Sequence, residues 1–559
     1  MNELRAFLPH TNIAYFTMEV ALRVEIHTYA GGLGVLAGDT ARSCADLELP
    51  VVFITPLSRE GYFRQQIDEN GRQIEHPDPW DIQRWAKPLA AMIGVRIEDR
   101  DVWVRPWLYV HTSDVRYSVP VLMLDTDLEQ NDPRDRGLTH CLYGGDEIYR
   151  LKQELVLGVG GVRVLEALGF NIGTFHLNEG HAAFATIELL KRFPRRRRQS
   201  DNSEWSYDAD RVRDLCVFTT HTPVEAGHDR FSYELVGRIA TDLLPVDALK
   251  QFGGDDRLNM TRLALNLSGY VNGVAQRHAI TAREMFPGFD VRAVTNGVHV
   301  GTWAHAAFAA LYQSHFPQWQ HEPEVLVRAD NLADEELWSA HVKAKADLCR
   351  LVFEHNGLEL DPNVPIIGFA RRMTGYKRPD LLFSDLERLA AIAERYPFQL
   401  VFSGKAHPAD AAGKDSLQNI HRSIRELQRR IRVAFLPNYD MSIAQVLVAG
   451  ADVWLNTPVP PLEASGTSGM KAAVNGVLNL STLDGWWIEG CVEGVTGWGI
   501  GDSSDAGPLY EKLETTVLPL YYNDRSHWMW MMKQAVSKIA CYFNSHRMMR
   551  RYAAEAYLR

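Results

Sequence analysis

The sequence predicts an α/β protein built on doubly wound parallel sheets. Short β-branched runs alternate with longer helical patterns, 46% of the residues are hydrophobic and 23% are charged, and 559 residues exceed one ordinary core. Strands that alternate with helices imply right-handed crossovers and therefore parallel strands. We expect two large domains, although up to four smaller ones would also fit this length.

The second half of the chain shows this alternation most clearly. Short apolar runs predict strands at 364–370, 398–404, 432–437, 452–457 and 476–482. Longer patterns predict helices at 378–396, 416–431 and 442–451.

The first half contains similar units. Strands are predicted within 12–19, 50–56, 173–190 and 215–223, while 101–127 resembles an antiparallel ribbon. The chain is expected to cross between domains near residue 298.

Composition excludes several classes of protein. A net charge of −11 argues against general affinity for nucleic acid or anionic membranes, and the basic residues within 191–204, including the arginine run 195–198, are interpreted as a solvated surface segment. The six cysteines lack CxxC spacing. No leader and no long apolar segment is evident, so a cytoplasmic protein without a membrane span is expected.

The loops that follow predicted strands carry the residues expected to bind ligands, because ligands of open α/β sheets bind beyond the carboxyl ends of the strands. The turn "GGLG" at 31–34 precedes a helical pattern and could bring backbone N–H groups close to an anion; an ordinary tight turn is the alternative.

The loop "ARRMTGYKRP" at 370–379 concentrates four cations, Arg371, Arg372, Lys377 and Arg378. Arginine forks and a lysine ammonium suit one or two phosphates. Ion pairs at a solvated helix start are the alternative.

Histidines offer weaker signals. His221 follows an apolar strand and could be a site residue or a satisfied core histidine. His176 and His181 are weaker candidates, and no pair has HExxH spacing, so no metal site is expected.

Lys471 lies in the small-residue segment "EASGTSGMK". It could be an exposed helical lysine, a phosphate ligand, or an amine that forms a Schiff base with a cofactor aldehyde. The residue types alone leave these three readings open.

Ten segments taken together resemble the α-glucan (glycogen, starch or maltodextrin) phosphorylases of the short bacterial type. Residues 463–485 resemble the segment that carries the cofactor lysine. The other nine occur in the family's order: "GGLGVLAGD", "REGYFRQ", "RLKQE", "HLNEGHAAFA", "THTPVEAGHDRF", "VNGVAQRH", "TNGVH", "ARRMTGYKR" and "SGKAHP". The resemblance extends from about residue 12 to the C-terminal helix.

This resemblance implies a GT-B fold, in which two Rossmann-like doubly wound domains, here 1–298 and 299–559, face each other across a cleft. The last helix would pack back on the N-terminal domain. It implies a glycosyltransferase that depends on pyridoxal 5'-phosphate. Inorganic phosphate would cleave the terminal α-1,4-linked glucose of glycogen or maltodextrin with retention, giving α-glucose 1-phosphate, with proton transfer through the cofactor's phosphate. Homodimers are usual in this family.

The same resemblance assigns roles to individual residues. The catalytic residues would be Lys471, Arg372, Lys377 and His221. Lys471 would carry the cofactor with the help of Arg371, Thr467, Ser468 and Trp303. Substrate phosphate would bind Arg372, Lys377, Gly31 and Gly32, and glucose would bind His221, Asn296, Tyr376, Glu463, Ser465, Gly466 and Leu33. Glu463 is interpreted as a sugar ligand, since this chemistry needs no carboxylate pair.

The sequence departs at two positions from the longer members of the family that it resembles. Gly469 and Thr374 replace an asparagine and a histidine of the longer members, and the resemblance implies that a regulatory extension is absent. Two alternatives stay open: a nucleotide-sugar glucan synthase of the same fold, and a catalytically silent glucan-binding protein.

Overall fold

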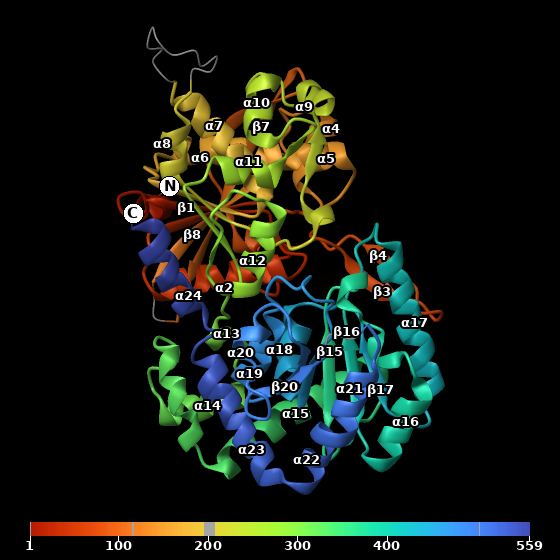
Figure 1. The fold of residues 1–559 in the computed structure, drawn as a ribbon. Coiled ribbons are helices and arrows are strands. Elements are labelled where there is room, and N and C mark those ends of the chain that lie inside the picture. Colours follow the sequence, from red (N-terminus) through yellow and green to blue (C-terminus); the bar gives the residue numbers. More distant parts are fainter. Residues whose placement is uncertain (1, 115–116, 195–206, 502–503, 559) are drawn as a thin grey trace.

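The computed structural model describes residues 2–114, 117–194, 207–501 and 504–558, which form two lobes (Figure 1). Each lobe is built on a large, mainly parallel sheet, so the predicted α/β class is confirmed. Most of the basic segment, including the arginine run 195–198, lies outside the described residues.

The N-terminal lobe holds a ten-stranded sheet in the described part of the chain. Its parallel strands are, in spatial order, β14 (Arg292–Ala293), β13 (Tyr270–Gly273), β10 (Cys216–Thr219), β9 (Thr174–Asn178), β1 (Ile13–Thr17), β2 (Val51–Pro56) and β8 (Ser118–Asp125). β7 (Arg100–Thr112) pairs antiparallel with β8, and β5 (Lys87–Pro88) and β6 (Ile93–Ile97) pair antiparallel with β7. The predicted antiparallel ribbon is therefore confirmed.

The C-terminal lobe holds a parallel sheet of six described strands. Their spatial order is β17 (Val433–Leu436), β16 (Gln399–Ser403), β15 (Ile366–Ala370), β18 (Val453–Asn456), β19 (Leu478–Thr482) and β20 (Gly497–Ile500). The first five were predicted. Their residues are all buried, which explains why they appear as continuous apolar runs.

Helices cover both sheets (Figure 1). The main helices of the N-terminal lobe are α2 (Gly32–Asp46), α5 (Glu147–Leu155), α6 (Gly161–Leu168), α7 (Phe184–Arg192), α8 (Ala209–Leu215), α9 (Tyr233–Ile239), α10 (Val246–Gly253), α11 (Met260–Asn266) and α12 (Gln276–Met285). Those that follow are α13 (Val300–Trp303), α14 (Ala306–His315), α15 (Asp334–Asn356), α16 (Leu386–Arg395), α17 (Ala411–Leu427), α18 (Met441–Gly450), α19 (Ser468–Val474), α20 (Trp487–Gly490), α21 (Gly507–Lys512), α22 (Leu518–Asn523), α23 (Arg525–Gln534) and α24 (Ser545–Tyr552).

One predicted helix is shorter than expected. The pattern at 378–396 suggested a helix from residue 378, but α16 begins only at Leu386. Arg378 has a left-handed backbone, with φ of 45°, and a single 3-10 turn precedes the helix. Asp385 then caps α16 by accepting a hydrogen bond from the Arg388 amide.

The chain passes between the lobes twice. After β14 it enters the C-terminal lobe through α13, and α24 returns to lie against α2 of the N-terminal lobe (Figure 1). The two crossings touch, because Val298 and Asn544 form a parallel bridge. A side chain on Gly297 would lie 2.1 Å from the Asn544 carbonyl oxygen, so glycine permits this close approach.

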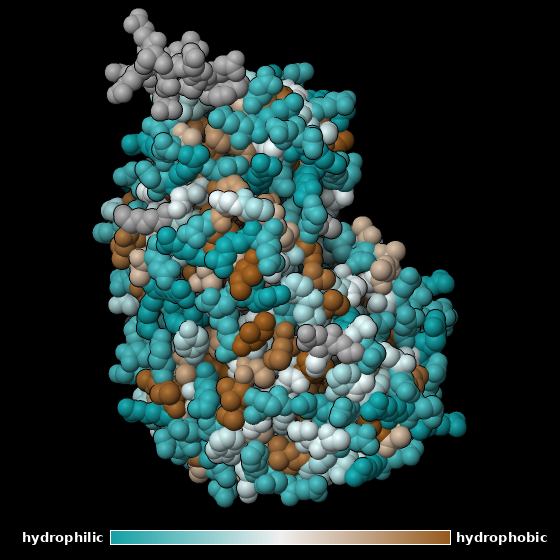
Figure 2. All heavy atoms as spheres, viewed as in Figure 1, coloured by the Kyte–Doolittle hydropathy of each residue, from teal (hydrophilic) through white to brown (hydrophobic). Residues whose placement is uncertain are grey.

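The molecular surface is mostly polar on the face in view. Figure 2 shows hydrophobic residues there as small separate groups among hydrophilic ones. Within the described ranges, no helix combines the length and the apolar character needed to cross a bilayer.

Candidate functional site

A buried carboxylate joins two of the cations that follow β15. Glu463 Oε2 lies 2.6 Å from Arg371 Nη2 and 2.5 Å from Lys377 Nζ, and all three side chains are at most 10% exposed. Arg371 Nη1 has no hydrogen-bond partner among the described residues although it is buried. This arginine can therefore bind a further anion without losing its contact with Glu463.

The ionisation of this cluster follows from its burial and its neighbours. Burial would raise the pKa of Glu463, but Arg371 and Lys377 together lower it below its ordinary value. Burial and the adjacent Arg371 lower the pKa of Lys377 to about 7, although Glu463 acts in the opposite direction. The cluster combines an ionised carboxylate with a lysine that can exchange a proton near neutral pH.

Arg372 reaches across to the other lobe. Its Nη2 atom lies where a β-carbon on Gly31 would be only 3.5 Å away, and its side chain is exposed rather than paired inside the lobe. The glycine turn and the arginine loop, distant in sequence, thus meet where the two lobes approach.

Glu19 organises the glycine turn. Its Oε2 atom accepts hydrogen bonds from the amides of Ala30 and Gly31, at 2.6 and 3.0 Å, and Tyr143 donates to Oε1 at 2.9 Å. A β-carbon on Gly34 would lie 2.6 Å from the same carboxylate. Because the Gly31 amide donates to Glu19, the amides from Gly32 onward, where α2 begins, are left to face an anion; Leu33 is partly buried beside them.

Lys471 is nearly buried and lies on an aromatic ring. Its Nζ atom is 4.1 Å from the centre of the Trp303 ring, and its exposed fraction is 8%. Trp303 Nε1 donates to Asp39 Oδ2 at 2.8 Å. Burial lowers the pKa of Lys471 to about 8, although Asp39 opposes this effect, so about a tenth of the amine is neutral and nucleophilic at pH 7, far more than for an ordinary lysine.

The segment before Lys471 is held from behind by a second strand-end loop. Asp484 accepts hydrogen bonds from the amides of Glu463 and Gly485, and Trp486 N donates to the Ser465 carbonyl oxygen at 3.0 Å. Gly466 has a φ of +84°, which places its backbone in the left-handed region. The Ser465 hydroxyl is buried without a partner among the described residues and remains able to bind a ligand.

Two adjacent tryptophans belong to the core beneath this segment. Trp486 and Trp487 are 2% and 0% exposed, and their ring centres lie 5.1 Å apart. Trp486 packs against Gly469, where a β-carbon would lie 2.9 Å from Trp486 Cζ2 and 2.2 Å from Asn479 Oδ1. The glycine at this position is therefore required by the local packing.

His221 lies beyond the carboxyl end of β10, as expected from the sequence. Its Nε2 atom is 2.6 Å from Asn178 Oδ1, and its amide donates to Glu179 Oε2 at 2.7 Å. Because Asn178 Nδ2 donates to Thr17, its Oδ1 atom is an acceptor, which assigns the proton to His221 Nε2. Burial lowers the pKa of His221 to about 4, so the ring is neutral and Nδ1 can accept.

The local contacts of the other candidate residues are as follows. Asn296 is 3% exposed, and its side-chain oxygen is buried without a partner among the described residues. Lys377 Nζ lies over the Tyr376 ring, 4.6 Å from the centre of that ring. Thr467 is the N-cap of α19, and the Ser468 hydroxyl accepts a hydrogen bond from Trp454 Nε1 at 3.1 Å.

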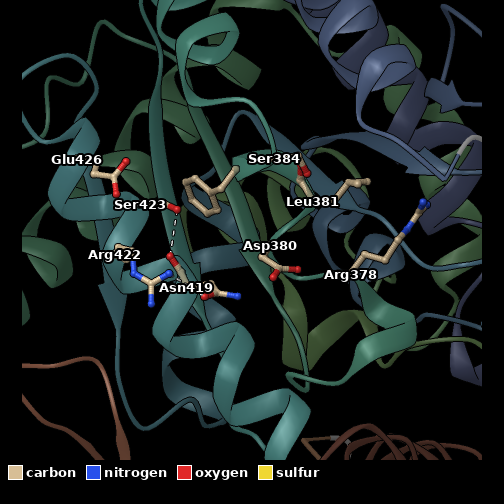
Figure 3. A pocket seen from close by; sticks show the side chains of 9 residues that line it. Arg378, Asp380, Leu381, Ser384, Asn419, Arg422, Ser423 and Glu426 are labelled. Atoms are coloured by element: carbon tan, nitrogen blue, oxygen red, sulfur yellow. Dashed lines mark hydrogen bonds between the residues drawn. The ribbon is translucent and has the colours of Figure 1, made fainter.

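Two hollows adjoin or neighbour these residues. One is lined by both lobes, with Tyr143, Arg150 and Asp229 on one side and His407 on the other. The other lies on the C-terminal lobe; its lining carries opposite charges, including Arg378, Asp380, Arg422 and Glu426 (Figure 3). The first hollow is linked to the glycine turn through Tyr143, which donates to Glu19, whereas the second is lined by Arg378 of the arginine loop.

The residues present fit a bound pyridoxal phosphate. Lys471 supplies a buried amine of lowered pKa, Trp303 supplies an aromatic face beside it, and Arg371 Nη1 is a buried donor without a partner among the described residues. These groups match an aldehyde, a ring and a phosphate respectively.

Comparison with known proteins agrees with the family resemblance seen in the sequence. Residues 228–495 match the family model described as carbohydrate phosphorylase. The chain is 39% identical to maltodextrin phosphorylase of Thermococcus litoralis, over 98% of this chain and 70% of that protein. It is 36% identical to glycogen phosphorylase of Aquifex aeolicus, over 98% of this chain and 86% of that protein.

The chain belongs to the carbohydrate phosphorylase family. It is also 29% identical, over 97% of its length, to an uncharacterized protein of Methanocaldococcus jannaschii, of which it covers 99%. The resemblance inferred from the ten sequence segments is confirmed at the level of the family.

Several residues that organise the site of this family member were not singled out from the sequence. They are Glu19, Asp39, Asn178, Glu179 and Asp484. Glu19 lies just after β1 and Asn178 and Glu179 lie at the end of β9, so the rule that ligand sites form at strand ends could have found them within the predicted segments 12–19 and 173–190. Asp39 lies inside a helical pattern and carried no such signal.

Proposed function

We propose that this chain is an α-1,4-glucan phosphorylase with the GT-B arrangement of two Rossmann-like lobes, 1–298 and 299–559, facing across a cleft. It would release α-glucose 1-phosphate from the end of glycogen or maltodextrin with retained configuration. The observation that carries this proposal is the buried amine of Lys471 on the Trp303 ring. A phosphorylase of this family needs such an amine to hold its pyridoxal phosphate.

The cofactor would be held by Lys471, Arg371, Trp303, Thr467 and Ser468. When bound, it supplies a second phosphate, whose pKa near 6 lets it share a proton with substrate phosphate at neutral pH.

Substrate phosphate would be bound by Arg372, Lys377 and the amides at the start of α2. Arg372 supports this role because it is exposed toward the turn at Gly31 rather than paired within its lobe. Lys377 can hold or release a proton at Nζ, since its pKa lies near 7. Concentrated cations reduce the repulsion between two neighbouring phosphates and stabilise negative charge as the glycosidic bond breaks.

Glucose would be oriented by neutral groups and one carboxylate. His221 Nδ1 can accept from a sugar hydroxyl, because Nε2 is already engaged with Asn178. Asn296 and Ser465 offer buried polar atoms without partners, while Tyr376, Glu463, Gly466 and Leu33 complete the proposed sugar contacts. The hollow lined by Tyr143 and His407 would admit the glucan chain.

Two experiments test this function. Borohydride treatment of the purified protein should fix a pyridoxyl group on Lys471, found by mass spectrometry, and the protein should convert maltoheptaose and phosphate to glucose 1-phosphate. Lys471→Arg should abolish both results. Lys405→Arg is the matched control for labelling, because burial also lowers the pKa of Lys405 to about 8.

The outcomes separate the rival functions. A protein that contains no pyridoxal would favour a nucleotide-sugar glucan synthase. Labelled Lys471 without glucose 1-phosphate would favour a silent glucan-binding protein.

A further inference from the structure

Three potential metal ligands meet where both crossings of the chain reach the N-terminal lobe. Asp46 ends α2, His299 caps α13 after the first crossing, and His546 is the second residue of α24 on the return. One ligand atom from each lies within 4.8 Å of the others. Figure 1 shows α2 and α24 side by side, with α13 just below them. None of these residues belongs to the proposed active site.

His546 is the least satisfied member of this group. Its side chain is 0% exposed, and neither ring nitrogen has a hydrogen-bond partner among the described residues. Its Nε2 atom nevertheless lies 3.2 Å from Asp46 Oδ2. A buried imidazole is unusual when its Nδ1 atom has no partner and its Nε2 atom contacts only one carboxylate, outside hydrogen-bond geometry.

A tetrahedral metal ion would account for this spacing. With metal-to-ligand distances of about 2.0–2.2 Å, two donor atoms of such a site lie about 3.3 Å apart and point at the metal rather than at each other. The 3.2 Å separation between His546 and Asp46 agrees with this geometry. His299 Nε2 is closer to Asp46 Oδ2, at 2.7 Å, and would move apart by about half an ångström to admit the ion.

The Nδ1 atom of His299 accepts a hydrogen bond from the Thr302 amide at 3.2 Å, so in the metal-free protein the ring proton lies on Nε2 and faces Asp46. Metal binding at Nε2 requires this proton to move to Nδ1, where the Thr302 hydroxyl, 2.8 Å away, can accept a hydrogen bond from it. The side chains of His299 and Asp46 are 13% and 10% exposed. An ion can therefore enter from this edge, and water can fill the remaining coordination position.

Neighbouring charges distinguish this group from a second group of potential metal ligands in the described part of the chain. Glu154, His181 and Asp229 also converge, but Arg150 Nε lies 3.4 Å from Glu154 and 3.3 Å from Asp229. That guanidinium already occupies the carboxylates and would repel a divalent cation. Asp46 forms ion pairs only with the two histidines within the described part of the chain.

We propose that Asp46, His299 and His546 bind one divalent transition-metal ion, of which Zn²⁺ is the best match to two imidazoles and one carboxylate. The ion joins α2 to both crossings and so acts as a structural link between the lobes. This site is independent of the proposed phosphorylase activity.

Metal binding to the cofactor-loaded protein tests this proposal. After EDTA treatment and removal of the chelator, the protein should bind one equivalent of Zn²⁺ or Co²⁺, and Co²⁺ should give the intense visible absorption of tetrahedral coordination. His546→Gln should weaken binding on the order of 100-fold or more. Added Zn²⁺ should raise the midpoint of thermal unfolding of the wild type but not that of His546→Gln.

His305→Gln is the matched control. His305 also caps a helix, and its Nε2 atom lies 2.9 Å from Asp347 Oδ2, but it has no third ligand in the described groups. This variant should keep full metal binding. His181→Gln should keep it as well, which excludes the second group as the source.

Three results would overturn the proposal. The wild type could bind no metal in excess of the His546→Gln variant, or lose its equivalent in His181→Gln, or give only the weak spectrum of octahedral Co²⁺. The visible spectrum of Co²⁺ bound to the wild type tests the proposal even if the His546→Gln variant does not fold. In each case the group would be a hydrogen-bonded clamp rather than a metal site.

Discussion

The Lys471 Nζ atom lies 4.1 Å from the centre of the Trp303 ring, and that ring is held by Asp39 of α2. The same helix begins next to Gly31, which faces Arg372. One helix of the N-terminal lobe therefore contacts both the residue proposed to bind the cofactor and the residue proposed to bind phosphate. This shared contact explains how two lobes can present a single site.

Replacing Trp303 should cost more stability than replacing another buried tryptophan. Trp303→Phe leaves the buried Asp39 carboxylate without its indole donor, and hydrogen bonds to charged groups contribute about 1.5–3 kcal/mol. Trp319 is equally buried, but its Nε1 atom donates to the neutral Gln313 side chain, so Trp319→Phe should lose about 0.5–1.5 kcal/mol from that bond. Urea unfolding measures the difference; equal losses would contradict the assigned role of Asp39.

Attachment of the cofactor should follow the titration of Lys471. Since burial lowers the pKa of this amine to about 8, the rate at which cofactor-free protein recovers bound pyridoxal phosphate should rise with pH and level off above about pH 8. Asp39→Asn removes a charge that raises this pKa, so its curve should move to lower pH. A rate that keeps rising toward the ordinary lysine pKa of about 10.4 would show that the amine is not buried.

Glu463→Gln should reduce activity through its effect on Lys377. Loss of the buried carboxylate leaves two cations uncompensated, and we expect kcat/KM for phosphorolysis to fall about 100-fold or more, equivalent to about 3 kcal/mol. Because Glu463 raises the pKa of Lys377, the descending limb of the pH profile should move to lower pH.

Glu188→Gln is the control for this prediction. Glu188 is also buried and contacts two arginines, Arg163 and Arg192, but it lies in α7 away from the proposed site. It should lose stability while keeping kcat/KM and its pH profile. Similar kinetic losses in both variants would mean that Glu463 acts only through stability.

Gly469→Ala should destabilise the segment that carries Lys471. The added methyl group would lie 2.2 Å from Asn479 Oδ1 and 2.9 Å from Trp486, and such overpacking costs about 1–3 kcal/mol. Gly237→Ala is the control, because it lies inside helix α9 with open space around it and should gain about 0.5–1 kcal/mol. Thermal unfolding of both variants checks the prediction, which fails if Gly469→Ala is neutral.

Asp452 should contribute stability that depends on pH. This buried carboxylate lies 2.8 Å from Lys345 and 2.9 Å from His341, and they hold its pKa below the ordinary value although burial opposes them. Asp452→Asn should cost about 3–5 kcal/mol at pH 7 in urea unfolding. A carboxylate of lowered pKa stabilises above its unfolded pKa of about 3.9, so the difference from wild type should shrink as pH falls below that value.

The half-exposed Asp347 provides the comparison. It also contacts a histidine and a cation, His305 and Arg350, but 34% of its side chain is exposed. Asp347→Asn should therefore cost at most about 1 kcal/mol. A loss at Asp347 as large as that at Asp452 would show that burial is not the deciding factor.

Strand positions could be predicted because residues that are buried in a strand are mostly apolar, and the sequence shows this directly. The strands at Ile366–Ala370 and Gln399–Ser403 are covered on both faces and therefore appear as unbroken apolar runs. The helix start at Leu386 could not be predicted in the same way. The left-handed Arg378 and the 3-10 turn after it depend on local geometry that the apolar pattern does not record.

By itself, the sequence determined the α/β class, the family and the loops that carry Lys471, Arg372 and His221, because short motifs and strand ends are local features. Only the tertiary structure decided which distant residues meet. Asp39 reaches Trp303 across 264 positions, and His299 reaches Asp46 across 253. No local pattern encodes such pairs, since they arise only when the chain crosses between its lobes and brings α2, α13 and α24 together.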